Sequence, residues 1–207
     1  TLRMVNGSVE EGVSGREFGV GIRIFRGLGS VYAFTNDTSR DGLMRTARQA
    51  AAALADQGES RHRDLVLTPK AHPNLHAIKL LPRTVEAAQK VDLMRRAHTV
   101  AAGYDELITQ VRIVYLDSEQ HVLIANSEGL WTEDERVRTR FVVEAVATKG
   151  NEKQTGYVGP GRQMGFELFS EVVDVEALAR EAARSAVTMI NADLCPSGRM
   201  PVIISNE

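Results

Sequence analysis

The sequence has a single cysteine, no long apolar run and no excess of either charge. Cys195 alone cannot form an internal disulfide or a zinc site built from several cysteines, and it favours a reducing compartment. No apolar run approaches the roughly 18 residues that a membrane-spanning helix needs. Lys and Arg number 25 against 27 Asp and Glu. This near balance argues against a protein held on nucleic acid mainly by phosphate electrostatics.

The composition is instead that of a soluble globular protein. The 207 residues are 43% hydrophobic and 25% charged, which provides enough apolar side chains for a substantial core. A chain of this length can form one large domain or two small ones.

Alternating apolar residues predict strands over most of the first 35 residues. A twisted hairpin is expected over residues 5–13, and two further strands over 20–25 and 31–34 follow as a β meander. Three segments instead show the 3.6-residue period of helices, at about 41–56, 84–102 and 174–193. The connection over residues 58–83 is long and irregular, and such connections are often functional.

The second half of the chain returns to the strand period. Strands are expected over residues 107–115 and 122–125, joined by a turn at 117–120, and then over 137–145 and 202–204. Strands are gathered between a few helices without regular βαβ alternation. The sequence therefore predicts an α+β fold, with a mostly antiparallel sheet and about three helices packed on it.

Candidate metal ligands are few. His72 and His76 have the spacing of two ligands on one helix face, but Pro73 disfavours the helical conformation at His72. An exposed loop with two histidines is the favoured interpretation, and His62, His98 and His121 are isolated.

A nucleophile or a phosphate-binding loop is equally hard to find. Cys195 lies at a predicted helix end, where the helix dipole raises the pKa of a thiol. The sequence Gly19-Val-Gly21 lacks the third glycine of a dinucleotide loop, and a strand continues through it.

Two further segments carry open alternatives. Arg136, Arg138 and Arg140 alternate along one strand face, where they form either a groove for acidic groups or, as the favoured interpretation, a solvated face paired with Glu133 and Glu135. Residues 156–165 contain four glycines and form either a cleft wall beside a bound chain or a wide β connection. The residues alone provide no complete active site.

Three stretches, in this order, resemble the amino-terminal region of the TldD/PmbA family of zinc-dependent peptidases. They are GVGIRIF at 19–25 with GSVYAFT at 29–35, GRQMGFELF at 161–169, and AARSAV at 182–187 with ADLCPSGRMPVII at 192–204. Family members are much longer. Their metal motif, H-E-x-x-x-H, follows the strand matched here by residues 202–204 and is absent from this sequence.

The resemblance implies that residues 1–207 are a TldD-like amino-terminal domain without the extreme amino terminus and without the catalytic domain. We therefore expect this fragment to be inactive alone, with no catalytic residue, metal ligand or cofactor of its own, and zinc to be bound by the intact protein. The resemblance also implies a cytoplasmic peptidase acting on unfolded peptides. From the charge balance and the lack of a long apolar run, we expect no role on membranes or nucleic acid. The functional assembly is expected to be a homodimer or a TldD–PmbA-type heterodimer.

The amino-terminal domain of the family is expected to frame the cleft and to receive the substrate as an added strand. Arg162, Gln163, Gly165 and Phe166 are the residues predicted to line that cleft. The alternative function is a non-catalytic module that binds a peptide or a partner through a sheet edge. A nucleic-acid role is a distant third, since the sequence shows no basic surface.

Overall fold

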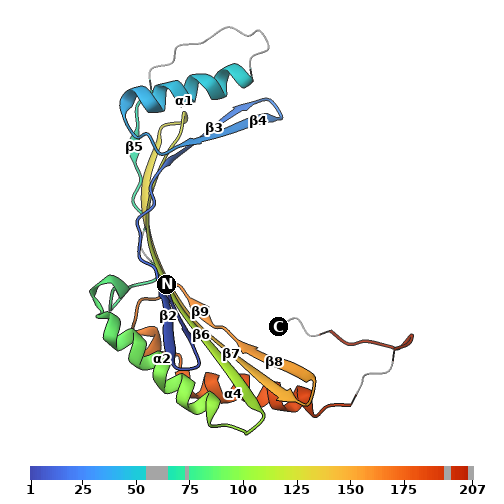
Figure 1. The fold of residues 1–207 in the computed structure, drawn as a ribbon. Coiled ribbons are helices and arrows are strands. Elements are labelled where there is room, and N and C mark those ends of the chain that lie inside the picture. Colours follow the sequence, from blue (N-terminus) through green and yellow to red (C-terminus); the bar gives the residue numbers. More distant parts are fainter. Residues whose placement is uncertain (55–64, 73–74, 194–196, 205–207) are drawn as a thin grey trace. The chain divides into compact units, whose positions relative to one another are not determined.

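A computed structural model describes residues 1–54, 65–72, 75–193 and 197–204. It divides into two compact units (Figure 1). The sheet unit comprises Thr1–Val13, Thr68–Asn126 and Leu130–Glu207, and the hairpin unit comprises Ser14–Leu67 and Ser127–Gly129. Among the described helices, none has the length and apolar character that a membrane crossing requires.

The sheet unit is built around a long pair of antiparallel strands. The strands are β1 (Leu2–Val5), β2 (Ser8–Gly12), β5 (Thr68–Pro69), β6 (Ile108–Ala125), β7 (Leu130–Lys149), β8 (Glu152–Val158) and β9 (Gly161–Arg162). Their order is β2-β1-β6-β7-β5, and β8 and β9 also pair with β7. Among the described strands only the short β5–β7 pairing is parallel, which confirms the predicted α+β fold with a mostly antiparallel sheet.

The helices of the sheet unit are η1 (Pro82–Thr84), α2 (Ala87–Ala102), α3 (Leu168–Glu171) and α4 (Val175–Ile190). The predicted long helices correspond to α2 and α4, whereas the four-residue α3 was not predicted because it is too short to show a period. The Asp174 carboxylate caps α4 by accepting hydrogen bonds from the backbone N–H groups of Glu176 and Ala177. Helices α2 and α4 lie on the same side of the sheet (Figure 1).

The core lies between these two helices and one face of the sheet. Alternate residues of β6 and β7 point into it, as the period of two predicts. The buried strand residues are Val111, Ile113, Tyr115, Phe141, Val143 and Ala145. They pack against Met94 of α2 and the alanines of α4, and burying a side chain such as Met94 stabilises the fold by about 2 kcal/mol.

Gly156 sets how closely α4 approaches β8. A Cβ atom at this position would overlap the carbonyl oxygen of Ala182 and lie 2.7 Å from the backbone nitrogen of Ala186. Both atoms belong to the backbone of α4, so no side-chain movement could make room. A glycine at position 156 is therefore required for helix and strand to pack at this distance.

The predicted turn at residues 117–120 is wrong. Strand β6 runs without interruption through these residues and pairs with β7 along its whole length. The polar side chains are accommodated because each of two carboxylates meets a cation, Asp117 with Lys90 and Glu119 with Arg83. The chain turns instead after Asn126, whose side-chain oxygen accepts from the Leu130 N–H at 3.0 Å.

The hairpin unit consists of β3 (Val20–Arg26), β4 (Gly29–Thr35) and α1 (Arg40–Ala53). Strands β3 and β4 form a separate two-stranded sheet. The expected meander over the first 35 residues is therefore two hairpins in two different sheets. Ser39 is the N-cap of α1, and its side chain accepts from the Gly42 N–H. The helix itself confirms the one predicted at about residues 41–56.

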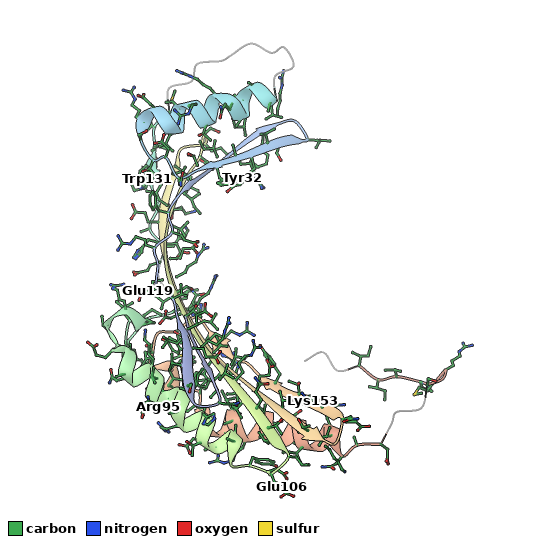
Figure 2. All side chains as sticks on the ribbon, viewed as in Figure 1. Tyr32, Arg95, Glu106, Glu119, Trp131 and Lys153 are labelled. Atoms are coloured by element: carbon green, nitrogen blue, oxygen red, sulfur yellow. The ribbon has the colours of Figure 1, made fainter. Side chains whose placement is uncertain are left out.

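One face of the β3–β4 hairpin carries exposed aromatic side chains. Phe25, Tyr32 and Phe34 are 70%, 58% and 80% exposed. Figure 2 shows Tyr32 on the side of the hairpin away from α1, and the Arg23 guanidinium lies 5.4 Å from the centre of its ring. We refer to Phe25, Tyr32 and Phe34 as the aromatic face.

The expected strand at residues 202–204 is not formed. Val202, Ile203 and Ile204 have no regular secondary structure and are 72%, 99% and 87% exposed. No described strand pairs with them, and an extended apolar segment needs a sheet neighbour to become a strand. Cys195 and His62 lie outside the described residues.

The packing at Gly156 leads to a first prediction. Replacing Gly156 with alanine should force α4 away from β8 and lower the free energy of unfolding by about 3 kcal/mol. The matched control is Gly12→Ala in β2, where a Cβ would meet only the Leu2 side chain at 3.4 Å; its effect should stay within about 1 kcal/mol. Urea unfolding followed by the fluorescence of Trp131, the single tryptophan, measures both. Equal stability of the two variants would contradict this account of the packing.

Candidate functional site

A hollow of about 450 Å³ lies on the sheet unit where β6, β7 and β9 meet. Its lining includes Leu116 and Ser118 from β6, Arg138 and Arg140 from β7, and Arg162 and Gln163 at β9. We call it the arginine hollow. It brings together two of the four predicted cleft residues, Arg162 and Gln163, with two arginines that the sequence singled out separately.

The register of the strands explains why these side chains meet. Leu116 lies opposite Arg140, and Ser118 lies opposite Arg138, and directly paired residues share a face of the sheet. Thr139 and Phe141, which alternate with these arginines, are buried on the face covered by the helices. Arg138 and Arg140 therefore point to the opposite face, which is free of described helices.

The arginines of the hollow are not neutralised by neighbouring carboxylates. Arg140 donates to the carbonyl oxygen of Gly159 at 3.1 Å and to the hydroxyl of Tyr157 at 2.9 Å. As far as the described residues show, Arg162 donates only to the carbonyl of Gly161. Within the described residues, Arg138 has no hydrogen-bond or ion-pair partner.

The pairing favoured from the sequence for this strand is thus wrong. Arg136 pairs with Asp134 at 2.6 Å, and Glu135 lies 3.7 Å from His121. Neither Glu133 nor Glu135 forms an ion pair with the strand arginines among the described residues. The strand does not present a face of mutually neutralised charges.

Asp117 is the one carboxylate among the described residues of the hollow lining, and Lys90 satisfies it. The Lys90 ammonium lies 2.7 Å from the Asp117 carboxylate, and both side chains are mostly buried. Burial is the largest single influence and favours the neutral acid, but the interactions with neighbouring groups, led by the hydrogen bond from Lys90, together keep the pKa of Asp117 below its ordinary value. Burial, and then the Asp117 charge, raise the pKa of the neighbouring Tyr115 phenol. The positive charge of the hollow is therefore uncompensated.

The other two predicted cleft residues, Gly165 and Phe166, do not line this hollow. Gly165 is buried against the backbone of residue 80, and a Cβ there would overlap the Leu80 carbonyl oxygen. The Phe166 N–H donates to that carbonyl at 2.8 Å. The Phe166 ring lies 5.1 Å from that of Phe169 and 6.3 Å from that of Tyr115, so it packs at the edge of the core.

Glu167 holds this segment in place. One carboxylate oxygen accepts from the N–H groups of Gly165 at 3.0 Å and Lys79 at 3.3 Å, and the other accepts from Leu80 at 2.9 Å. Burial raises the pKa of this carboxyl, but the backbone donors together lower it below its ordinary value. Glu167 is 4% exposed and joins two parts of the chain 87 residues apart.

Glu167 was not predicted as a site residue. The sequence feature that could have identified Glu167 is its position: a carboxylate directly after Gly165-Phe166, within an otherwise apolar stretch from Met164 to Phe169. A charge that is buried in such surroundings needs several donors. The sequence could not show that those donors come from residues 79 and 80.

The glycine-rich segment forms the end of β8, a turn and β9, which is the wide β connection considered from the sequence. Among the described residues no group of three His, Cys, Asp or Glu side chains could hold a metal ion. His72 and His76 are exposed and lie outside helices. A second hollow, of about 390 Å³, is lined by His121 and three carboxylates, Glu133, Asp134 and Glu135.

The arginine hollow is suited chemically to binding an anion. Its described lining contains no cysteine or histidine that could act as a nucleophile or a general base. Guanidinium groups with free N–H donors instead favour planar anions such as carboxylates. The geometry is that of a recognition site.

Comparison with known proteins identifies two family models along the chain. The PmbA/TldA metallopeptidase domain 1 matches residues 1–54, and the PmbA/TldA metallopeptidase central domain matches residues 80–190. A metalloprotease of Methanothermobacter thermautotrophicus is 32% identical over the whole chain. A TldD homolog metalloprotease of Buchnera aphidicola is 22% identical over 97% of it.

A solved structure shows the same fold. The crystal structure of a Thermotoga maritima protein, proposed to modulate a DNA gyrase, matches 95% of this chain with a TM-score of 0.71 and 21% identity. The chain spans less than half the length of these proteins: 44% and 42% of the two curated relatives and 43% of the solved chain.

The Glu167 anchor generates a second prediction. Because the pKa of Glu167 is lower in the folded state, its charge stabilises the fold above the unfolded pKa, and that stabilisation is lost as the pH falls through the folded pKa. Glu167→Gln cannot accept from all three N–H groups and should cost about 2 kcal/mol at pH 7. It should also remove part of the acid dependence of stability.

The control is Glu171→Gln, one turn further on. Glu171 forms an exposed ion pair with Lys79, and losing it should change stability by less than about 1 kcal/mol. Urea unfolding between pH 3 and 7 compares the two variants with the wild type. Identical pH profiles for Glu167→Gln and the wild type would contradict the assigned role.

Proposed function

The chain belongs to the TldD/PmbA metallopeptidase family, and on that premise we propose that it is the amino-terminal region of a TldD-like peptidase. In this proposal residues 1–207 frame the substrate cleft and contribute a dimer surface, in a cytoplasmic enzyme that cleaves unfolded peptides. The observation that carries the proposal is the order of the matched models, domain 1 followed by the central domain. The relatives extend for more than the same length again.

The division of labour follows from the chemistry of the residues. The described residues offer no cluster of His, Cys, Asp and Glu that fits a metal ion, so we assign zinc and the hydrolytic step to parts of the intact protein outside this chain. A zinc-bound water supplies the attacking nucleophile in such peptidases. The residues described here would bind and orient the peptide.

The sheet unit offers an edge on which a peptide could lie. Strand β8 pairs with β7 on one side, and no described strand pairs with its other side. Unpaired N–H and C=O groups along such an edge accept an extended peptide as an additional strand. Arg162 and Gln163 would contact the substrate from the hollow, while Gly165 and Phe166 would support the cleft wall from the core side.

The third prediction concerns the intact protein. The gene, read beyond the codon for Glu207, should encode H-E-x-x-x-H shortly downstream. The full-length protein should bind zinc and cleave an unstructured peptide, and a chelator should abolish the cleavage. The 207-residue chain should bind no stoichiometric zinc and should have no peptidase activity, as measured by metal analysis and by mass spectrometry of the peptide.

Two controls make this test decisive. Exchange of the motif's glutamate for glutamine should abolish cleavage while zinc remains bound, because that residue activates the water. A stop codon directly after Glu207 would overturn the peptidase and favour the alternative, a non-catalytic peptide-binding or partner-binding module. Stoichiometric zinc in the 207-residue chain would contradict the assignment of the metal to other parts.

The proposed dimer surface is the aromatic face of the hairpin unit. Three large aromatic side chains that share one face of a short sheet are unusual on a monomer and typical of interfaces. A two-stranded sheet also has two edges that can pair with another strand. The proposed partner that covers this face is a second copy of this chain in a homodimer, or a PmbA-type subunit in a heterodimer.

The fourth prediction tests the homodimer with Phe25→Thr/Phe34→Thr. Threonine preserves strand propensity while it removes the aromatic surface. Sedimentation velocity should give twice the chain mass of 22.7 kDa for the wild type and the chain mass for the double variant. Leu123→Thr, at an exposed position of β6, should leave the dimer intact. A double variant that remains dimeric would overturn this surface, and a wild type that is monomeric at all concentrations would overturn the homodimer.

A further inference from the structure

The arginine hollow has a charge that the family assignment does not explain. Arg138, Arg140 and Arg162 line one concavity of the sheet unit, and no described carboxylate forms an ion pair with any of them. The nearest carboxylate in the lining, Asp117, is already paired with Lys90. Three guanidinium groups that share one hollow repel one another, so an anion in the hollow relieves that repulsion.

The backbone fixes the spacing of the three groups. Arg138 and Arg140 are two residues apart on β7, so their Cα atoms lie roughly 6–7 Å apart on the same face. Arg162 comes from β9, which pairs directly with β7 at Thr139 and Arg140; neighbouring strands are about 4.8 Å apart. Arg138 and Arg140 therefore start on the same face of the sheet, whereas Arg162 lies opposite Thr139 on the short strand β9 and enters the lining of the hollow from there.

One of the three arginines is preoriented, and the others have free donors. Two N–H groups of Arg140 are held by Gly159 and Tyr157, which fixes the plane of its guanidinium. Arg138 has no partner among the described residues, so all five of its N–H donors are available. A planar acceptor with two oxygens matches this arrangement better than a single point charge does.

The remaining lining indicates the kind of molecule that carries the anion. Leu116 supplies an apolar contact, and the Ser118 hydroxyl and the Gln163 amide supply neutral hydrogen-bonding groups. A volume of about 450 Å³ accommodates one or two amino-acid residues rather than a large cofactor. Mixed apolar and polar contacts beside an anion-binding group are the chemistry of an acidic residue or of a peptide's end.

We propose that the arginine hollow binds a carboxylate of the peptide substrate through Arg138, Arg140 and Arg162. This inference rests on the proposed function and adds a specificity to it, namely a preference for peptides that present a carboxylate at this site. The carboxylate is that of the carboxyl terminus or of an Asp or Glu side chain, since both have the same chemistry. The hollow thus selects and positions the peptide without taking part in bond cleavage.

The fifth prediction measures peptide binding to the 207-residue chain by fluorescence anisotropy. The probes are four labelled, unstructured peptides of equal length: a neutral sequence with a free carboxyl terminus, the same sequence amidated, an amidated sequence with one internal glutamate, and an amidated sequence with one internal lysine. At least one carboxylate peptide should bind about tenfold or more tightly than the amidated neutral peptide. The first two probes identify a terminal carboxylate, and the third identifies a side-chain carboxylate.

Variants assign the selectivity to the hollow. Arg138→Gln and Arg162→Gln should each reduce the preference for carboxylate peptides about tenfold, and Arg138→Glu should shift the preference to the lysine peptide. The matched control is Arg95→Gln on α2, which removes the same charge from an exposed position on the helix side of the sheet (Figure 2). Its binding should equal that of the wild type, and circular dichroism should show all variants folded.

Equal binding of all four peptides would overturn the inference, as would the absence of binding, or the same loss in Arg95→Gln as in Arg138→Gln. None of these outcomes touches the proposed peptidase function, which is decided separately by the zinc content and activity of the full-length protein. An active full-length enzyme whose fragment shows no carboxylate preference would refute this site alone.

Discussion

The β6–β7 ladder is the interaction on which the rest of the sheet unit depends. Its register shifts once, between Ile108 and Gln110, and is then continuous from Gln110 opposite Val146 to Ala125 opposite Trp131. The other described strands of this sheet are attached to these two. Strand β1 pairs with β6 and in turn pairs with β2, while β5, β8 and β9 pair with β7. A slip of β7 by one residue in this ladder would move its buried side chains to the solvent face and Arg138 and Arg140 to the core face.

The ladder thereby separates stability from recognition on the two faces of one strand. On β7 the residues of one parity, including Thr139, Phe141 and Val143, are buried under the helices. The residues of the other parity, including Arg138 and Arg140, line the hollow. A strand whose helix side is fully packed can carry unpaired cations on its other side. The free energy gained by burying the side chains on the helix side compensates the repulsion between the arginines on the other side.

The sequence predicted what is set locally. Alternation located β1 to β4 and much of β6 and β7, and the helical period located the three long helices, whereas β5, β8 and β9 were not predicted. Ser39 and Asp174 cap two of those helices through their short polar side chains. Contacts between residues far apart in the sequence could not be predicted from it. The polar residues 117–120 predict a turn when the sequence is considered alone. In the fold they continue the strand, because Lys90 and Arg83 neutralise Asp117 and Glu119. For the same reason the sequence could not show that the buried Glu167 ties Gly165 to residues 79 and 80.

This dependence on distant contacts also explains why the arginine hollow can be selective. Side chains on paired strands are held in direction by the backbone hydrogen bonds of both neighbours, so a ligand that enters does not first have to order a loop. Arg140 illustrates this, because Tyr157 and Gly159 already hold its guanidinium through the β8–β9 connection. The glycines of that connection are thus structural requirements of recognition: Gly156 lets α4 close on β8, and Gly161 lies opposite Arg140 in the ladder. In the proposed peptidase, such a hollow would discriminate between peptides by charge before they reach the catalytic centre.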